Sequence, residues 1–308
     1  MRRTIKRQLT LVSIVVVFVA LLLGIKTMME GQSKLHNIHD LQNIVTLSTS
    51  ISLFVHESQK ERGTSAGFIG SSGKKFADKL APQRQLTDKE QKRYTETLEK
   101  IDLSRYPQSL SDKVKTIDEM LKKLPSIRSR VDSLSISAAE QVDFYTLLNK
   151  HLLDIVASTA VLSSDTEIVK QLGAYANFLK AKERTGIERA VLSNTFAAGT
   201  FAPNMFVKLI TLVSEQVSYI DSFLGTASPV SIAFYEKTMR NPLVAEVEKM
   251  RNIAIDKAAV GNFGVDATHW FDTITSKINL LKEVDDALAQ EVLTSLSILK
   301  SNAQKQMF

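Results

Sequence analysis

Residues 269–308 read HWFDTITSKINLLKEVDDALAQEVLTSLSILKSNAQKQMF. Apolar side chains recur in this stretch at intervals of three or four residues, which is the period of one face of an α-helix. The repeating positions are Ile274, Ile278, Leu281, Val284, Leu288, Val292 and Leu296. The same spacing runs through residues 41–55 and 142–155, and no stretch sustains the two-residue alternation of a strand. With only 12 glycines and 6 prolines in 308 residues, the sequence predicts an all-α fold of long helices.

The N-terminus has the pattern of a membrane helix. Residues 1–26 read MRRTIKRQLTLVSIVVVFVALLLGIK, a basic start followed by an apolar run over residues 9–25. A bilayer core about 30 Å thick requires roughly 17 to 25 apolar residues, so this run can span it. A cleaved secretory signal is the alternative, but no A-x-A cleavage site precedes Lys26. We therefore expect a transmembrane helix over residues 9–25.

The distribution of charge indicates how such a helix is oriented. Basic residues precede the apolar run, which predicts a cytoplasmic N-terminus over residues 1–8. In a bacterium, this is a single-pass protein of the inner membrane with the following domain in the periplasm. Five basic and no acidic residues lie in residues 1–26, which leaves +1 of the net +6 for the rest of the chain. Nucleic acid is therefore not expected as a partner. The absence of cysteine excludes disulfides and cysteine-based zinc sites.

Helix-breaking residues divide the remaining chain. We expect breaks at Gly70–Gly73, Pro82, Pro107, Pro125, Ser163–Asp165, Ala198–Pro203, Gly225–Pro229, Pro242 and Gly261–Gly264. Ser164 or Asp165 can cap one helix, and Pro229 and Pro242 suit a first helical turn. The resulting helices are joined by short connections and are best accommodated in two four-helix bundles that share long helices.

The predicted domain boundaries follow from these breaks. A juxtamembrane helix covers residues 26–45, and the helical domain covers residues 46–290. Its two bundles are expected at about residues 46–160 and 161–290. Residues 291–308 extend the last helix.

Two short segments place arginine and glycine together in a helix. They are QKERGTSA at residues 59–66 and KERTGIERA at residues 182–190. Glycine inside a helix costs about 1 kcal/mol relative to alanine, so its position beside charge favours a close approach by another group. At 100° per residue, Arg62 shares a stripe with Ser65, and Lys182 shares a stripe with Arg189.

Two such arginines on facing helices can hold one small anion. The planar guanidinium group matches a planar oxyanion such as nitrate, and Ser65 can supply a further donor. The alternative is an ordinary solvated face with an i,i+4 pair between Arg184 and Glu188, worth only tenths of a kcal/mol. Spacing alone favours the solvated face over an anion site. The glycine within both segments weakens that preference.

A third segment, ATHWFDTITSKIN at residues 267–279, follows these two in order. Together the three resemble the nitrate- and nitrite-sensing domain family of bacteria, whose members commonly show the elements E-R-G-x-S-A, K-E-x-x-G-x-E-R-A and W-F-x-x-x-T-x-x-I. The resemblance covers roughly residues 45–290. It implies an all-helical sensor of two four-helix bundles, found in chemoreceptors, sensor kinases, cyclases and a soluble antitermination regulator.

The resemblance also assigns candidate ligands for nitrate or nitrite. The arginines of the first two elements are Arg62 and Arg189. Lys277 and Arg251 are candidates for a further basic ligand from the late helices, and the stripes add Lys182 and Ser65. Trp270 and Phe271 are most simply core residues, although a ring near the ligand can shape the site. No metal, cofactor or catalytic residue is expected.

The combined hypothesis is an extracytoplasmic sensor that binds a small oxyanion and relays it as a helix movement in signal transduction. Such a receptor is expected to be a homodimer in the bilayer and to act through a second membrane pass or a signalling partner subunit. The alternative is a membrane-anchored adaptor that acts through helix–helix association without a small ligand. An enzyme is disfavoured because no nucleophile, metal site or paired acid and base is evident.

Overall fold

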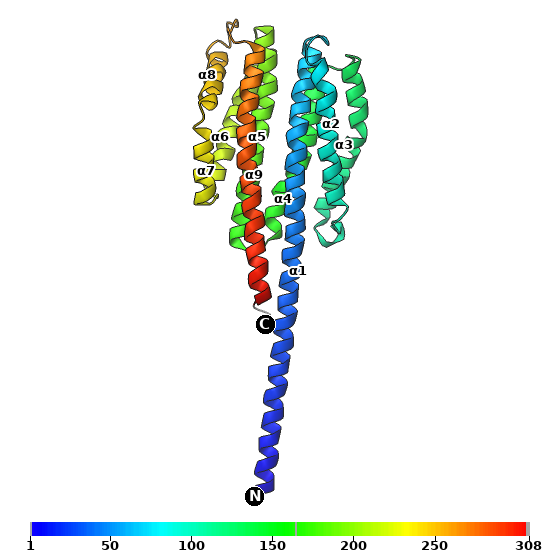
Figure 1. The fold of residues 1–308 in the computed structure, drawn as a ribbon, viewed down its shortest axis with the longest axis vertical. Coiled ribbons are helices and arrows are strands. Elements are labelled where there is room, and N and C mark those ends of the chain that lie inside the picture. The colour runs from blue at the N-terminus through cyan, green and yellow to red at the C-terminus, as the bar shows by residue number, and fades with distance from the viewer. Residues whose placement is uncertain (1, 164, 306–308) are drawn as a thin grey trace. The chain divides into compact units, whose positions relative to one another are not determined.

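The computed structural model describes residues 2–163 and 165–305 of the chain, and the side chains of these except residues 2–10, 12 and 161 (Figure 1). The described part contains nine α-helices, two short 3-10 helices and no strand. The helices are α1 (Arg2–Gly70), α2 (Ala77–Leu98), α3 (Gln108–Asp132), α4 (Ala138–Thr159), α5 (Thr166–Ala198), α6 (Met205–Leu224), α7 (Pro229–Met239), α8 (Pro242–Asp256) and α9 (Ala267–Lys305). The prediction of an all-α fold is confirmed.

The chain divides into two compact units. One consists of the described parts of Met1–Asn43 and Leu293–Phe308, and the other is Ile44–Val292. In the first unit, α1 carries apolar side chains such as Phe18 and Leu23 that are about 60% exposed. Among the described residues, α1 is the one helix that is long and apolar enough to cross a membrane. It continues without interruption through the predicted boundaries at residues 25 and 45.

The unit Ile44–Val292 consists of two four-helix bundles (Figure 1). The C-terminal part of α1 packs with α2, α3 and α4 in the first. The second contains α5, α6 and α9, and the consecutive helices α7 and α8 together occupy its fourth position. This confirms the predicted architecture. The helix α1 of one bundle and α5 of the other are the elements that carry the two arginine segments.

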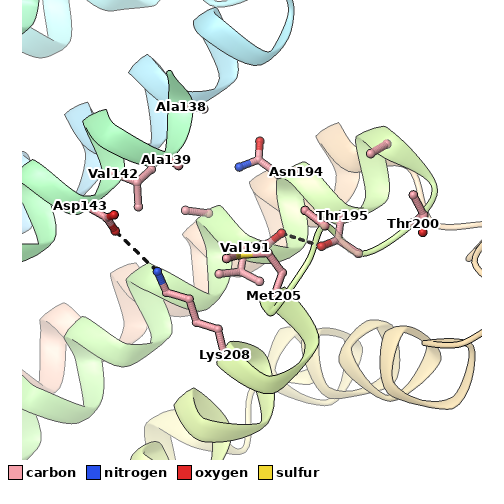
Figure 2. Close-up of a pocket in the computed structure, with 13 residues that line it drawn as sticks. Ala138, Ala139, Val142, Asp143, Val191, Asn194, Thr195, Thr200, Met205 and Lys208 are labelled. Atoms are coloured by element: carbon pink, nitrogen blue, oxygen red, sulfur yellow. Dashed lines mark hydrogen bonds and ion pairs between the residues drawn. The ribbon is translucent and has the colours of Figure 1, made fainter. Parts of the chain in front are cut away.

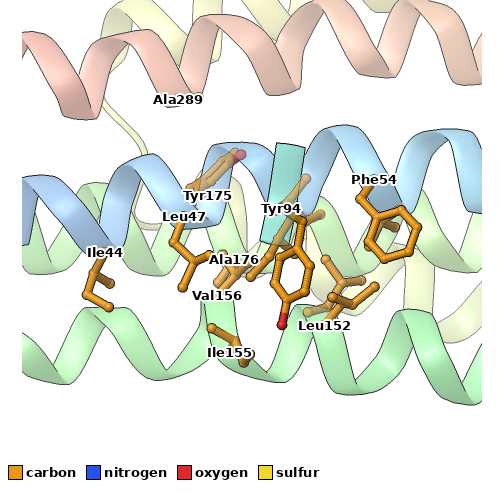
Figure 3. Packing of buried hydrophobic residues seen from close by; sticks show 14 of the residues in the cluster. Ile44, Leu47, Phe54, Tyr94, Leu152, Ile155, Val156, Tyr175, Ala176 and Ala289 are labelled. Carbon is orange, nitrogen blue, oxygen red and sulfur yellow. The ribbon is translucent and has the colours of Figure 1, made fainter. Parts of the chain in front are cut away.

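Apolar side chains from both bundles form a continuous core. Figure 3 shows Leu47 and Phe54 of α1 beside Tyr94 of α2 and Leu152 of α4, and all four are fully buried. Burying one such side chain contributes roughly 1.5–3 kcal/mol. Tyr175 of α5 belongs to the same cluster, so the core extends from the first bundle into the second.

Most helix ends follow the predicted signals. The side chain of Asp165 accepts hydrogen bonds from the backbone of Glu167 and Ile168, and Pro229 and Pro242 begin α7 and α8. Ser164, the other candidate cap, lies outside the described residues, as do Met1 and residues 306–308 of the predicted end segments.

The breaks predicted at Pro82 and Pro125 are wrong. Both prolines lie inside helices, in α2 and α3 respectively. A proline removes one backbone hydrogen bond, but tertiary packing of an apolar face usually decides whether a helix continues. Here Leu124 and Val131 are buried on either side of Pro125, so the packed face of α3 runs through it.

Candidate functional site

Two arginines are buried where α1 and α5 face each other. Arg62 and Arg189 are 0% and 1% exposed. Arg62 donates from Nη1 to the carboxylate of Glu183 at 2.5 Å and to the hydroxyl of Thr146 at 3.0 Å. Arg189 donates from Nη1 to the hydroxyl of Thr275 at 3.0 Å and from Nη2 to the carbonyl oxygen of Gln59 at 2.7 Å. The alternative of a solvated charged face is therefore wrong for both arginines.

Several buried donors in this cluster have no partner within the protein. They are Nε and Nη2 of Arg62, Nε of Arg189 and the hydroxyl of Ser65. A buried donor without a partner costs about 1–3 kcal/mol, and more when it is charged. Because guanidinium donors are involved, the group best suited to accept from them is an anion.

Glycines on both helices leave space for the arginine side chain of the opposite helix. A Cβ atom placed on Gly186 of α5 would lie 2.9 Å from Nη2 of Arg62. On Gly63 of α1 it would lie 3.2 Å from Nη2 of Arg189. Each glycine thus accommodates the arginine of the opposite helix, and the predicted close approach is confirmed.

The electrostatics of the cluster favour a single negative charge. Burial, and then repulsion from Arg62, lower the pKa of Arg189 to about 9, and Glu183 opposes this shift. Two guanidinium groups and one carboxylate leave one positive charge uncompensated. A monovalent anion would compensate it in a region where water is excluded and charge interactions are strong.

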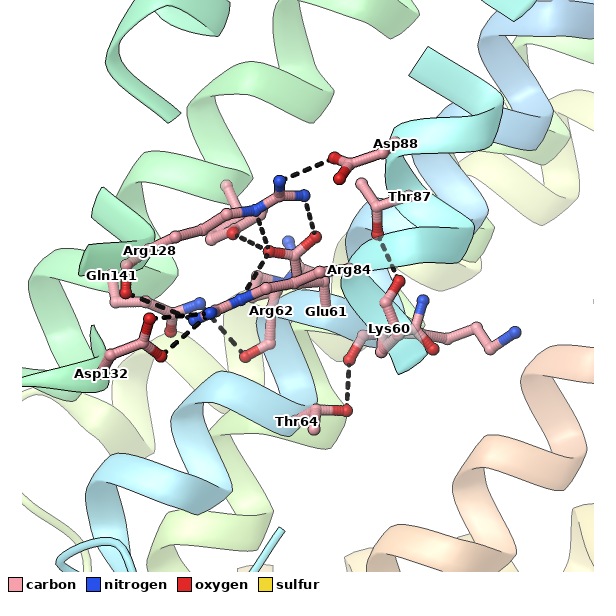
Figure 4. Close-up of polar contacts among 12 residues, drawn as sticks. Lys60, Glu61, Arg62, Thr64, Arg84, Thr87, Asp88, Arg128, Asp132 and Gln141 are labelled. Carbon is pink, nitrogen blue, oxygen red and sulfur yellow. Dashed lines mark hydrogen bonds and ion pairs between the residues drawn. The ribbon is translucent and has the colours of Figure 1, made fainter. Parts of the chain in front are cut away.

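The glutamate before each arginine is held by its own bundle. Arg128 of α3 donates to Glu61 through Nε and Nη2 at 2.7 and 2.8 Å (Figure 4). In the second bundle, Arg251 of α8 donates to Glu188 through the same two atoms at 2.6 and 2.8 Å. The two bundles therefore share one arrangement. In each, a bidentate arginine–glutamate ion pair fixes the Glu-Arg segment within its bundle.

Two of the predicted ligands, Arg251 and Lys182, pair with other residues. Arg251 is the partner of Glu188, so the predicted pair between Arg184 and Glu188 is wrong, and Arg184 pairs instead with Glu215 of α6 at 2.5 Å. Lys182 pairs with the buried Asp285 of α9.

Lys277 lies near the charges of the Glu188–Arg251 pair. It is buried, and its pKa is lowered by burial and then by repulsion from Arg251, with Glu188 opposing the shift. Of the predicted ligands, the structure thus brings together Arg62 and Arg189, with Ser65 close in sequence to Arg62 and unpaired.

Sequence reasoning missed the groups that position the arginines. Glu183, Gln59 and Thr275 pair across helices, and the spacing of residues within one helix does not predict such contacts. A signal was nevertheless present for two of them. Glu183 is the glutamate of the K-E-x-x-G element, and Thr275 is the threonine of the W-F-x-x-x-T element.

Comparison with known proteins identifies the domain. A family model described as "Nitrate and nitrite sensing" matches residues 53–293, most of the chain. The chain belongs to this family. The nitrate- and nitrite-sensing domain thus covers both bundles and both arginines.

Two relatives support the assignment of this nitrate- and nitrite-sensing domain. A nitrate regulatory protein of Klebsiella oxytoca is 28% identical over 262 residues, which cover 85% of this chain and 65% of the relative. The match therefore spans less than two thirds of that protein's length. The solved structure of the NasR transcription antiterminator is similar with a TM-score of 0.79 and 25% identity, over 88% of this chain and 78% of that one.

These relatives correct the expectation of an extracytoplasmic sensor. One is a transcription antiterminator and the other a nitrate regulatory protein, so both are regulators and the expected role outside the membrane is wrong. The basic residues before an apolar helix bear on its orientation in a bilayer and carry no information about what the domain regulates. The exclusion of nucleic acid as a partner also loses its support, because the similar structure is that of an antiterminator.

Proposed function

We propose that the nitrate- and nitrite-sensing domain binds one nitrate or nitrite ion between Arg62 and Arg189 and makes the chain a nitrate-responsive regulatory protein. The observation that carries this proposal is the set of buried guanidinium donors without a partner, contributed by helices of both bundles. The family assignment supplies the identity of the anion.

The donors define how the ion is held. Nε and Nη2 of Arg62 form one edge of a planar fork, and Nε of Arg189 approaches from the other helix. A trigonal planar oxyanion accepts from both directions through different oxygens, and the hydroxyl of Ser65 adds a neutral donor. Chloride lacks this planar arrangement of acceptors, so it binds more weakly.

Binding stabilises the contact between the bundles. Arg62 lies on α1 of the first bundle and Arg189 on α5 of the second, so an ion between them compensates repulsion between two helices. A ligand changes a conformational equilibrium only through its preference for one state, and coupling of about 1–3 kcal/mol is typical.

Calorimetric titration of the full chain in detergent with nitrate, nitrite and chloride tests this function. Replacing Arg62 or Arg189 with lysine keeps the charge beside Glu183 but removes the fork. We expect each variant to lose at least tenfold in affinity, about 1.4 kcal/mol. Arg184→Lys, on the same helix as Arg189, is the matched control and should bind nitrate with the affinity of the wild type. A wild type without binding, or arginine variants with unchanged affinity, would refute the proposal.

The regulated process is proposed from the relatives. One relative is named a transcription antiterminator and the other a nitrate regulatory protein. We infer that the whole protein acts in the same class of regulation, with nucleic acid as a partner. A nitrate-dependent change in reporter expression that is lost in Arg62→Lys would support this inference.

We also propose that residues 9–25 attach the protein to a bilayer. The described apolar side chains of this segment are roughly half exposed or more. An 18-residue window of the helix described from Ser13 onward has a mean hydropathy of 2.0. Exposed apolar surface of this extent is unfavourable in water. Cell fractionation tests the attachment. The full chain should stay with membranes after a carbonate wash, and a chain without residues 1–26 should be released.

A further inference from the structure

A pocket of about 510 Å³ lies beside the arginine pair. Its lining comes from the end of α1, the loop that follows, α5 and the start of α9. Most of these residues are small, including Gly63, Ala66 and Ala190. Neither arginine is part of the lining, and both are buried.

Phe271 stands between this pocket and Arg189. Its ring belongs to the lining, and the guanidinium carbon of Arg189 lies 5.0 Å from the ring centroid. The same ring would come within 3.2 Å of a Cβ atom on Gly63, so it fits closely against α1. Phe76, which follows α1, packs edge-on against it with centroids 5.5 Å apart. Displacement of the Phe271 ring would therefore open the pocket towards the guanidinium group.

The charge at the pocket favours an anion. Among the described residues that line it, Lys75 is the charged one, and it is exposed. A basic side chain at the rim of a low-dielectric opening attracts anions and raises their association rate.

A second pocket is also lined by residues of α5 (Figure 2). Its lining comes from α4, α5, α6 and the loop between α5 and α6, and it shares Ala190, Asn194 and Ala198 with the first pocket. The buried cluster of Ala66, Val142 and Ala190 packs where the two pockets adjoin. The acidic Asp143 lies at the second pocket with its carboxylate 3.7 Å from Nζ of Lys208, so this side lacks a net positive charge.

We propose that the first pocket is the entrance through which nitrate or nitrite reaches the arginine pair, and that Phe271 is the gate of this entrance. The inference rests on the proposed binding of an anion by Arg62 and Arg189. A gate controls how fast the ion enters and leaves. It therefore changes the association and dissociation rates by the same factor and leaves their ratio nearly unchanged.

The single tryptophan of the chain provides the readout. Trp270 precedes Phe271, and its Nε1 donates to the carbonyl oxygen of Arg189 at 3.2 Å. Stopped-flow fluorescence of the full chain mixed with nitrate or nitrite should report binding beside the arginines. For Phe271→Ala, we expect both rates to increase at least tenfold, while the calorimetric Kd stays within about threefold of the wild type.

Two matched charge reversals identify the entrance. Lys75→Glu alters the first pocket and Lys208→Glu the second. We expect Lys75→Glu to slow association about threefold at low ionic strength, with the effect fading as salt is added. Lys208→Glu should leave the association rate within twofold of the wild type. The reverse order would overturn the assignment of the entrance.

The outcomes separate this inference from the binding function. If the wild type binds nitrate but Phe271→Ala leaves both rates unchanged, the gate is refuted and the binding function stands. If Phe271→Ala weakens Kd through faster dissociation alone, the ring is a wall of the site and not a gate. A wild type that binds neither anion in calorimetry refutes both proposals.

Discussion

The carboxylate of Glu183 accepts from Nη1 of Arg62, the same guanidinium group whose Nε and Nη2 are left for the anion. It accepts from Arg62 at 2.5 Å and from the side-chain amide of Gln59 at 2.5 Å, and it is 1% exposed. A planar carboxylate held by a guanidinium group resembles a bound oxyanion in shape and charge. Glu183 therefore competes with the ligand for the same positive charge.

Replacing this carboxylate with an amide should tighten binding. Glu183→Gln keeps the shape of the side chain and removes its charge, so we expect the affinity for nitrate to rise about tenfold, roughly 1.4 kcal/mol. Calorimetry measures the change. Glu215→Gln, which alters the partner of Arg184 on the outer side of α5, is the control and should have no effect. Weaker binding by Glu183→Gln would show that the carboxylate positions Arg62 more than it competes.

The lowered pKa of Arg189 predicts how affinity depends on pH. Its pKa is about 9 in the protein, and an anion beside it favours the charged form. Affinity should thus be constant below about pH 8 and fall as pH rises past 9, approaching tenfold per pH unit. Titrations from pH 7 to 10 test this, with Arg184→Lys followed in parallel as a control for general alkaline effects. Affinity that stays flat to pH 10 would contradict it.

At the scale of the helix, two glycines of α5 differ in what surrounds them. A Cβ on Gly186 would lie 2.9 Å from Arg62, whereas one on Gly173 would meet nothing within 4 Å. Both positions are helical and would gain up to about 1 kcal/mol from alanine through helix propensity alone. Comparing the two positions therefore separates the effect of helix propensity from the effect of steric contact with Arg62.

Alanine at these two positions should have opposite consequences. Gly173→Ala should raise the melting temperature and leave nitrate affinity unchanged. Gly186→Ala should displace the guanidinium group of Arg62 and reduce affinity about tenfold, roughly 1.4 kcal/mol. Thermal unfolding and calorimetry measure both variants. Equal affinities would mean that the close approach at Gly186 does not matter for the ligand.

How well the sequence predicts a feature depends on whether neighbouring residues or distant parts of the chain determine it. Helix ends marked by caps are determined by neighbouring residues, so the sequence correctly predicts the helix starts at Asp165, Pro229 and Pro242. Pro125 misleads because the apolar face of α3, and not its local propensity, keeps the helix continuous. The arginines are predictable from their motifs. The K-E-x-x-G element marks Glu183, but the pairing of each arginine with Glu183 or Gln59 is not predictable, because these contacts join residues more than 100 positions apart.

At the scale of the whole unit Ile44–Val292, each bundle keeps its Glu-Arg segment in place without the ligand. The pairs Glu61–Arg128 and Glu188–Arg251 each lie within one bundle, whereas Arg62–Glu183 joins the two. The anion site therefore belongs to the contact between bundles and not to either bundle alone. Its occupation should stabilise the assembled pair of bundles more than it changes the interior of each.

This arrangement predicts a ligand-dependent melting temperature. A ligand that binds only the folded state at 100 times its Kd adds about 2.7 kcal/mol, which for a unit of this size corresponds to roughly 5–10 °C. Differential scanning calorimetry of the full chain with nitrate or nitrite measures the shift. Arg62→Lys should show little of it, and chloride at equal ionic strength should show little in the wild type, because both lack the planar match between fork and oxyanion. A shift of the same size with chloride would mean that charge alone, and not the geometry of the two guanidinium groups, accounts for binding.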